Sequence, residues 1–193
     1  MNLIIEPLTL GLTADYLDFF DHRAFSDGNP CGPCYCTGPS MDVATERQMV
    51  SEFGGNVKAV CRRYAVSLLA EGKIHGYLAF DDGKAIAWCN AGNMDDYVSR
   101  IPDVARKNAC GKTMAVVCFA IAPAYRGMGV ATAFLEHVIS DASRDGYRAV
   151  EGYAKVRNAR VYHDYNGPMR LYQKAGFVEV ARFDDIVVMR REL

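Results

Sequence analysis

The stretch from Met114 to Arg144, with Arg126-Gly127-Met128-Gly129-Val130-Ala131 at its centre, decides the fold of this chain. The apolar run Met114–Ile121 predicts a buried strand, which Ala122-Pro123 ends. After the glycines, apolar residues recur at helical spacing and predict an amphipathic helix that Asp145-Gly146 closes. The chain order here is therefore strand, glycine turn, helix.

This glycine turn has the chemistry of an anion site. The first N–H groups of a helix lack partners within the helix, and a start without side-chain bulk presents several of them to one anion. Gly127 and Gly129 let a phosphate approach the main chain, and Arg126 adds positive charge and a planar fork of donors. We therefore expect a pyrophosphate site made by Arg126, Gly127, Met128, Gly129, Val130 and Ala131.

Two motifs resemble those of one enzyme family. Arg126 to Ala131 looks like the R/Q-x-x-G-x-G/A signature of the GNAT superfamily of N-acetyltransferases. Leu171-Tyr172-Gln173-Lys174-Ala175-Gly176-Phe177 is similar to the L-Y-x-x-x-G-F element near the end of GNAT domains. The order and spacing of the two motifs make the pair specific, and the resemblance covers roughly the last half of the chain.

The resemblance implies a fold, a co-substrate and residue roles. The fold is a mixed α/β one, with a central, mostly antiparallel sheet, helices on both faces, and a splayed strand pair that admits acetyl-CoA. The backbone of Phe119, Ala120 and Ile121 would hold the pantetheine arm, and Tyr172 would be the general acid that protonates the leaving thiolate. The alternative is that Tyr172 has no catalytic role and is a tyrosine that packs at the edge of the core.

Other interpretations of the glycine turn remain open at this stage. Gly127-Met128-Gly129 could belong to a dinucleotide loop, with Glu151 near the spacing of the ribose-binding acid, but Thr132 replaces the third glycine. Such a unit normally opens its domain, whereas this one comes late. A P-loop is excluded because no Gly-Lys-Ser/Thr follows, and a purely structural turn is the remaining alternative.

The general base is poorly determined by the sequence. The strand before the turn carries no acid, so Glu151, on the following strand, is the best carboxylate candidate, and His163 is a second. The family often has an asparagine seven residues before the motif tyrosine, where this chain has Tyr165 with Asn166 beside it. That departure leaves the acceptor side of the site undefined.

The rest of the sequence predicts elements in a mixed α/β order. Asp81-Asp82-Gly83 predicts a hairpin turn, Thr13 is expected to cap the first helix, and residues 94–106 are partly helical. Strands are expected near residues 3–7, 74–80, 84–91, 114–121, 147–153, 177–182 and 185–191, and helices near 13–21, 42–53, 57–70, 131–144 and 168–175.

Composition limits the class of protein. With 193 residues and 50% hydrophobic content, we expect one domain, with a variable part over residues 1–72 and a cofactor-binding core over 73–193. A net charge of -1 and a pI near 6.4 give no support for nucleic-acid binding. No apolar stretch has membrane-spanning length, no signal peptide is evident, and seven scattered cysteines fit the cytoplasm.

A cysteine-rich loop, Cys31-Gly32-Pro33-Cys34-Tyr35-Cys36, is the other conspicuous feature. Its C-x-x-C-x-C spacing could bind zinc together with His22, but no second C-x-x-C follows. It could also form a redox pair, but it is not at a helix start after a strand. We expect the loop to pack beside the acceptor pocket, with Tyr35 and Trp88 lining that pocket. No metal site is therefore predicted.

The leading hypothesis is an acetyl-CoA-dependent N-acetyltransferase. It would move the acetyl group by direct attack of a primary amine, from a small molecule or a peptide. Homodimerisation is an expectation by analogy with the family alone. The alternatives are a non-catalytic acyl-CoA sensor, and a zinc or redox interaction protein that uses Cys31, Cys34 and Cys36.

Overall fold

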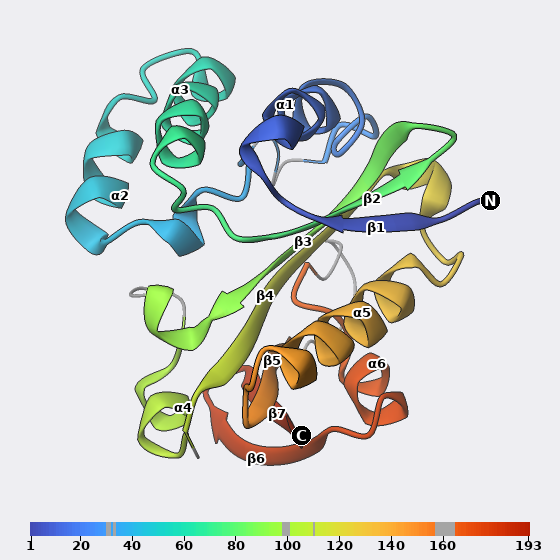
Figure 1. The fold of residues 1–193 in the computed structure, drawn as a ribbon. Coiled ribbons are helices and arrows are strands. Elements are labelled where there is room, and N and C mark those ends of the chain that lie inside the picture. The colour runs from blue at the N-terminus through green and yellow to red at the C-terminus, as the bar shows by residue number, and fades with distance from the viewer. Residues whose placement is uncertain (30–31, 33, 98–100, 110, 157–164) are drawn as a thin grey trace.

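The computed structural model describes residues 1–29, 32, 34–97, 101–109, 111–156 and 165–193. These residues form a single seven-stranded sheet of order β1-β2-β3-β4-β5-β7-β6 (Figure 1). Every neighbouring pair is antiparallel except β4 and β5, which are parallel. The strands are β1 (Ile4–Pro7), β2 (Gly76–Asp81), β3 (Lys84–Asn93), β4 (Thr113–Ile121), β5 (Ala149–Lys155), β6 (Val178–Phe183) and β7 (Ile186–Glu192). The predicted mixed α/β class is confirmed.

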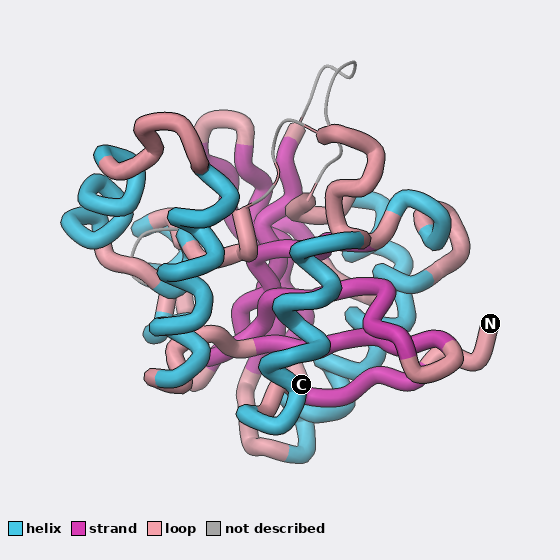
Figure 2. Tube along the Cα trace, turned by 90° about the horizontal axis from the view of Figure 1, so that it is seen from above, coloured by secondary structure: helices cyan, strands magenta, loops and turns pink. Residues whose placement is uncertain are grey.

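Helices lie on both sides of this sheet (Figures 1 and 2). One buried cluster joins α1 and α3 to the sheet, and another joins α5 and α6 to the opposite face. A third, smaller cluster joins α4 to β4, β5 and β7. The helices are α1 (Thr13–His22), α2 (Val43–Ser51), α3 (Val57–Ala70), α4 (Asp103–Lys107), α5 (Val130–Arg144) and α6 (Met169–Lys174).

Local sequence explains most of the element boundaries. Asp42 and Asn56 cap α2 and α3 by accepting hydrogen bonds from backbone N–H groups in the first turn. Asp82 and Gly83 have φ of +48° and +73°, as the predicted hairpin turn between β2 and β3 requires. The prediction that Thr13 caps α1 is wrong, because Thr13 is already the first helical residue and the cap position belongs to Leu12.

The parallel pair β4–β5 is short, and this positions the site. Pairing runs from Thr113 opposite Ala149 to Val116 opposite Gly152 and then stops. Strand β4 nevertheless continues to Ile121, and β5 continues to Lys155. The two strands therefore separate toward their carboxyl ends, and the splayed pair implied by the resemblance is present.

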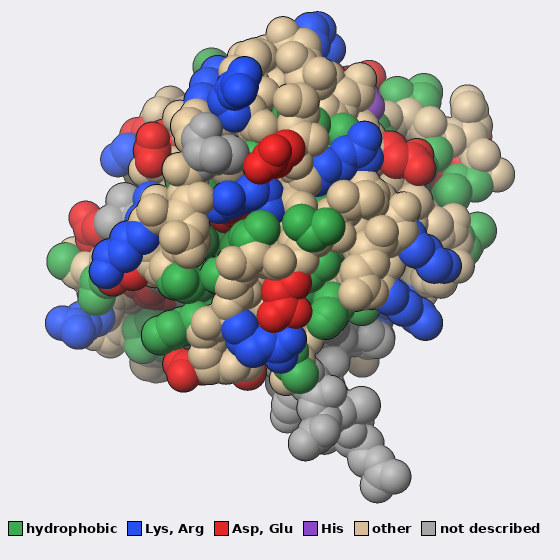
Figure 3. All heavy atoms as spheres, turned by 90° about the horizontal axis from the view of Figure 1, so that it is seen from below, with side chains coloured by type: hydrophobic (Ala, Val, Ile, Leu, Met, Phe, Trp, Pro, Cys, Tyr) green, Lys and Arg blue, Asp and Glu red, His purple; other side chains and the backbone are tan. Residues whose placement is uncertain are grey.

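The surface in Figure 3 shows no extended area of one charge. Lys and Arg side chains on that face are interspersed with Asp and Glu, and apolar side chains are exposed between them. Strand β6 lies at one edge of the sheet, with Val178 62% and Phe183 54% exposed. None of the helices in the described part of the chain combines the length and apolarity needed to cross a membrane.

Candidate active site

The glycine turn has the geometry of an anion cradle. Gly127 and Gly129 have φ of +78° and +86°, in the left-handed region that favours glycine. A Cβ atom at either position would meet no heavy atom within 4 Å, so the space beside the main chain is open. Gly129 is the N-cap of α5 and makes no side-chain cap hydrogen bond, while the helical ladder begins with Ala133 N–H donating to the Gly129 carbonyl. The earlier N–H groups of α5 therefore suit an external anion.

Arg126 is held by one group at the end of β4 and one on the loop after α1. Its Nε donates to the Ile121 carbonyl at 3.0 Å, and its Nη1 lies 2.5 Å from Oδ2 of Asp27. The Arg126 guanidinium keeps the pKa of Asp27 below its ordinary value. No local pattern predicts this ion pair, because Asp27 lies 99 residues away on the loop after α1. The pair fixes the guanidinium beside the glycine turn.

The free edge of β4 already has one partner within the chain. Phe119 lies opposite Cys89 of β3, and its N–H donates at 2.6 Å to the carbonyl of Tyr165. Ala120 and Ile121 lie opposite Trp88 and Ala87. The segment that contains Tyr165 therefore reaches into the splay, beside the backbone predicted to hold a pantetheine arm.

Tyr172 lies on α6 and is fully buried against β5. A Cβ atom on Gly152 would come within 2.1 Å of its ring, so only glycine at that position admits this packing. The ring also contacts Phe177 edge-on, with centroids 5.4 Å apart. The hydroxyl donates to the Asn166 carbonyl at 2.5 Å. The phenol group is thus held beside the point where β4 and β5 separate.

Glu151 lies on the other face of β5, in a buried cross-strand pair. Arg190, its register partner on β7, places Nε 2.7 Å and Nη2 2.6 Å from Oε1 of Glu151. The Tyr153 hydroxyl donates to Oε2 at 3.1 Å. Burial raises the pKa of Glu151, and Arg190 and Tyr153 oppose that rise. Glu151 itself has no exposed surface, so its contact with substrate would need an intermediary.

A cavity of about 400 Å³ fills the splay on the Tyr153 side. It brings together the diverging ends of β4 and β5 and the cysteine-rich loop. Asn166, which accepts the Tyr172 hydrogen bond, lines it, and so does Tyr153, which donates to Glu151. Its lining comprises Cys34, Cys36, Gly38, Pro39, Val117, Cys118, Tyr153, Lys155, Asn166 and Ile186.

Comparison with known proteins agrees with this geometry. The model of the acetyltransferase (GNAT) family matches residues 48–177, more than half of the chain. No curated protein matches the sequence.

The chain belongs to the GNAT acetyltransferase family.

The resemblance drawn from the two motifs is thereby confirmed, and the protein is an acyltransferase whose acetyl donor is acetyl-CoA. Solved structures with the same fold include PaiA N-acetyltransferase from Thermoplasma acidophilum with coenzyme A (10% identity, TM-score 0.57, 100% of both chains covered). Another is the Drosophila melanogaster polyamine N-acetyltransferase that forms N-acetylagmatine (12%, 0.58, 100% of both chains). A third is N-acetyltransferase from Staphylococcus aureus Mu50 (14%, 0.54, 100% of this chain and 99% of that one).

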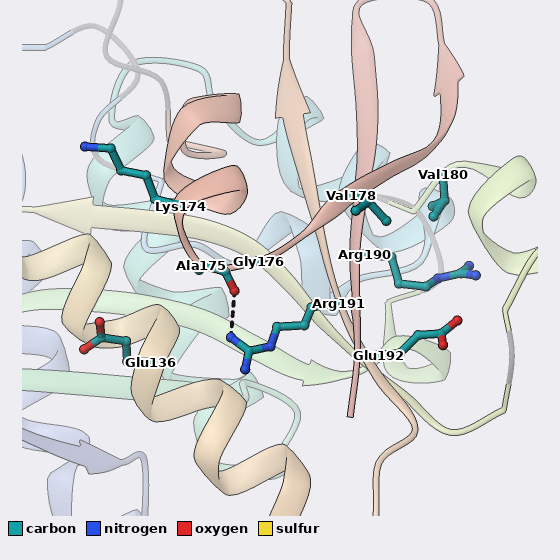
Figure 4. A pocket seen from close by; sticks show the side chains of 9 residues that line it. All are labelled: Glu136, Lys174, Ala175, Gly176, Val178, Val180, Arg190, Arg191 and Glu192. Carbon is teal, nitrogen blue, oxygen red and sulfur yellow. Dashed lines mark hydrogen bonds between the residues drawn. The ribbon is translucent and has the colours of Figure 1, made fainter.

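A second hollow in this GNAT protein lies away from the predicted site residues. It has a volume of about 730 Å³ and lies between α5, the end of α6 and the β6–β7 hairpin (Figure 4). Arg191 lines it and donates to the Ala175 carbonyl at 2.7 Å, as Figure 4 shows. Arg190 also lines it, and its guanidinium donates to Glu151. None of the predicted site residues lines this hollow, whereas the smaller cavity lies in the splay.

The expectations for the cysteine-rich loop are partly wrong. Tyr35 and Trp88 are fully buried beneath α1 instead of lining the cavity, and Trp88 contacts Tyr16 edge-on at 4.9 Å. Among the described residues, no group of His, Cys, Asp or Glu could hold a metal ion. Cys31 and His163 lie outside the described residues. The loop does reach the cavity, but through the thiols of Cys34 and Cys36.

Sequence reasoning missed Tyr153, although a signal was present. Tyr153 is two residues after Glu151 on a strand, so both side chains project to the same face. Period-two alternation along β5 was therefore sufficient to pair the two groups. Lys155, two residues further along β5, also lines the cavity.

The Glu151–Arg190 pair predicts a specific pattern of stability. In Arg190→Met the carboxylate is left buried without its cation, which should cost about 3–5 kcal/mol of unfolding free energy. The double variant Glu151→Met/Arg190→Met should recover most of that loss, because no charge is then buried. Urea unfolding measures both.

Arg182→Met supplies the matched control, because it removes a partner from the exposed Arg182–Glu179 pair. It should change stability little. Equal losses in the single and double variants of the buried pair would contradict the interpretation.

Proposed function

We propose that this protein transfers the acetyl group of acetyl-CoA to a primary amine of a small molecule or peptide, by direct attack in a ternary complex. The uncapped, glycine-lined start of α5, placed where β4 leaves the splay, carries the proposal. Acetyl-CoA supplies an activated thioester carbonyl. The residues of the chain bind its diphosphate, orient the reacting groups and move two protons.

The diphosphate would bind to N–H groups from Gly127 to Ala131 and to Arg126. The helix start supplies main-chain donors and the positive end of the helix dipole. The Arg126 guanidinium has five N–H donors in a fixed fork, of which Nε and Nη1 contact Ile121 and Asp27. When the diphosphate binds, the guanidinium would therefore either contact the diphosphate and Asp27 at the same time, or leave Asp27 to contact the diphosphate.

The two faces of β5 would divide the proton transfers. Tyr172 approaches from the α6 face, where its hydroxyl can donate to the departing sulfur. On the opposite face, Tyr153 lines the cavity and its hydroxyl donates to Glu151. An amine in that cavity could pass a proton to the Tyr153 oxygen while the Tyr153 proton moves to Glu151. Glu151 would then act as the base through Tyr153, and burial keeps its pKa raised, which favours proton uptake.

Binding of acetyl-CoA tests the anion cradle. Arg126→Ala should weaken binding about 10- to 100-fold, because a charge-assisted hydrogen bond to phosphate is lost. Arg144→Ala, on the last turn of the same helix, should bind like the wild type. Isothermal titration calorimetry measures all three proteins. The proposal fails if the wild type does not bind, or if Arg126→Ala binds equally well.

The leaving-group acid is tested by Tyr172→Phe. Phenylalanine keeps the ring packed over Gly152 and removes only the hydroxyl. With an acceptor identified by coenzyme A release from an amine panel, kcat should fall about 100-fold or more. The Kd for acetyl-CoA should stay within a factor of about two, because the ring still fills its site. An unchanged kcat would show that Tyr172 is not the acid and serves only in core packing.

The proton path through Tyr153 is tested by pH profiles. Because Glu151 must be deprotonated to accept a proton, kcat/KM should rise with pH through its raised pKa and then level. Tyr153→Phe and Glu151→Gln should each lower kcat and remove that acidic limb. Urea unfolding identifies any loss due to misfolding. A well-folded Tyr153→Phe enzyme with the wild-type profile would exclude the path.

A further inference from the structure

Three thiols line the cavity in the splay, and the reaction described above uses none of them. Cys34 and Cys36 come from the cysteine-rich loop, and Cys118 comes from the middle of β4. All three are free cysteines in the structure. Two segments distant in sequence thus place sulfur atoms at one wall of the cavity.

The loop holds Cys36 in a costly backbone conformation. Tyr35 and Cys36 both have φ of +46°, a left-handed conformation that costs a residue with a side chain about 1 kcal/mol or more. Two hydrogen bonds maintain it: the Tyr16 hydroxyl donates to the Tyr35 carbonyl in the core, and the Tyr35 hydroxyl donates to the partly buried Asp21. The position of Cys36 is therefore determined by its surroundings.

Asn90 brings the two sulfur atoms together. It lies opposite Cys118 in the β3–β4 register, so both side chains project to the same face of the sheet. Its Nδ2 donates to Sγ of Cys36 at 3.3 Å, and the Tyr97 hydroxyl fixes the amide by donating to Oδ1 at 2.6 Å. Asn90 thus contacts Cys36 and is the register partner of Cys118, and both thiols line the same cavity. The geometry therefore places the two thiols near each other.

We propose that Cys36 and Cys118 are an oxidative modification site, which closes the acceptor side of the splay when it forms a disulfide. This inference rests on the proposed function of the cavity. With hydrogen peroxide as oxidant, the thiolate of the half-buried Cys118 attacks one peroxide oxygen, giving a sulfenic acid and, after proton uptake, water. Cys36 then displaces the sulfenic oxygen as a second water. Both thiol hydrogens leave as water, and the two electrons reduce the O–O bond.

The new bond would tie the loop to β4 across the cavity wall. An amine acceptor needs the space that the cysteine-rich loop and β4 enclose, so the linked form should exclude it while the glycine turn stays open to acetyl-CoA. Oxidation should therefore abolish turnover and leave acetyl-CoA binding within about twofold of the reduced protein.

The rate of oxidation should depend steeply on pH. The hydrogen bond to Cys36, and then burial, raise the pKa of the Cys118 thiol, so its thiolate is scarce at neutral pH. Because the thiolate is the reacting species, the rate should increase about tenfold per pH unit from pH 7 to 9.

Peptide mapping tests the proposal on the full chain. Reduced protein is treated with hydrogen peroxide, free thiols are blocked by alkylation, and the digest is analysed by mass spectrometry without reductant. A Cys36–Cys118 linked peptide, two hydrogens lighter than its parts, is expected, together with loss of turnover that dithiothreitol restores. A Cys31–Cys34 link in its place, no link, or a linked enzyme with full turnover would overturn the proposal.

Matched variants separate this pair from the other cysteines. Cys36→Ser and Cys118→Ala should each resist inactivation by peroxide, whereas Cys61→Ser, which changes a buried cysteine on α3, should be inactivated like the wild type. If a variant does not fold, the wild-type peptide map still decides the matter. The map does not depend on acetyl transfer, so a protein without turnover can still show or lack the link.

Discussion

The early end of the β4–β5 pairing is the constraint on which the site depends. After Val116 and Gly152 the two parallel strands no longer share hydrogen bonds, and each has a main-chain edge that needs partners. One β4 amide, that of Phe119, is satisfied by Tyr165, which brings the preceding part of the α6 segment into the gap. The same separation makes room for the cavity. It also leaves the last residues of β4, which lead into the glycine turn, unpaired with β5. A sheet paired to its ends would have neither feature.

The opening has chemically different walls because β5 alternates its side chains. Gly152 has no side chain, and this allows the Tyr172 ring to lie against the strand from the α6 side. Its neighbours Glu151 and Tyr153 project to the opposite side, where Arg190 balances the buried carboxylate. One strand thus separates the Tyr172 hydroxyl from the Glu151 carboxylate by alternation alone. Glycine at the central position is as necessary to this arrangement as either functional group.

The sequence predicted what local patterns determine and missed what distant contacts determine. Helix α3 begins and ends at the predicted residues, because Asn56 caps it and Gly72 follows its end with a positive φ. The glycine turn was likewise predictable, because Gly127 and Gly129 stand between a strand pattern and a helix pattern. In contrast, no local signal paired Arg126 with Asp27, and the splay itself came from family resemblance. Trp88 was placed in the pocket although it is buried, since an aromatic residue on a strand has the same pattern in both settings.

The N-terminal region, which lies before the part matched by the family model, completes the site. That match begins at residue 48, yet Asp27 holds Arg126, and Cys34 and Cys36 line the cavity. The glycine turn and the splay therefore lie within the part that the family model matches, whereas one wall of the cavity comes from the loop before it. Tyr35 and Cys36 of this loop both have a positive φ. Backbone strain persists where surrounding contacts enforce it, and here the contacts from α1 enforce it at the cavity wall.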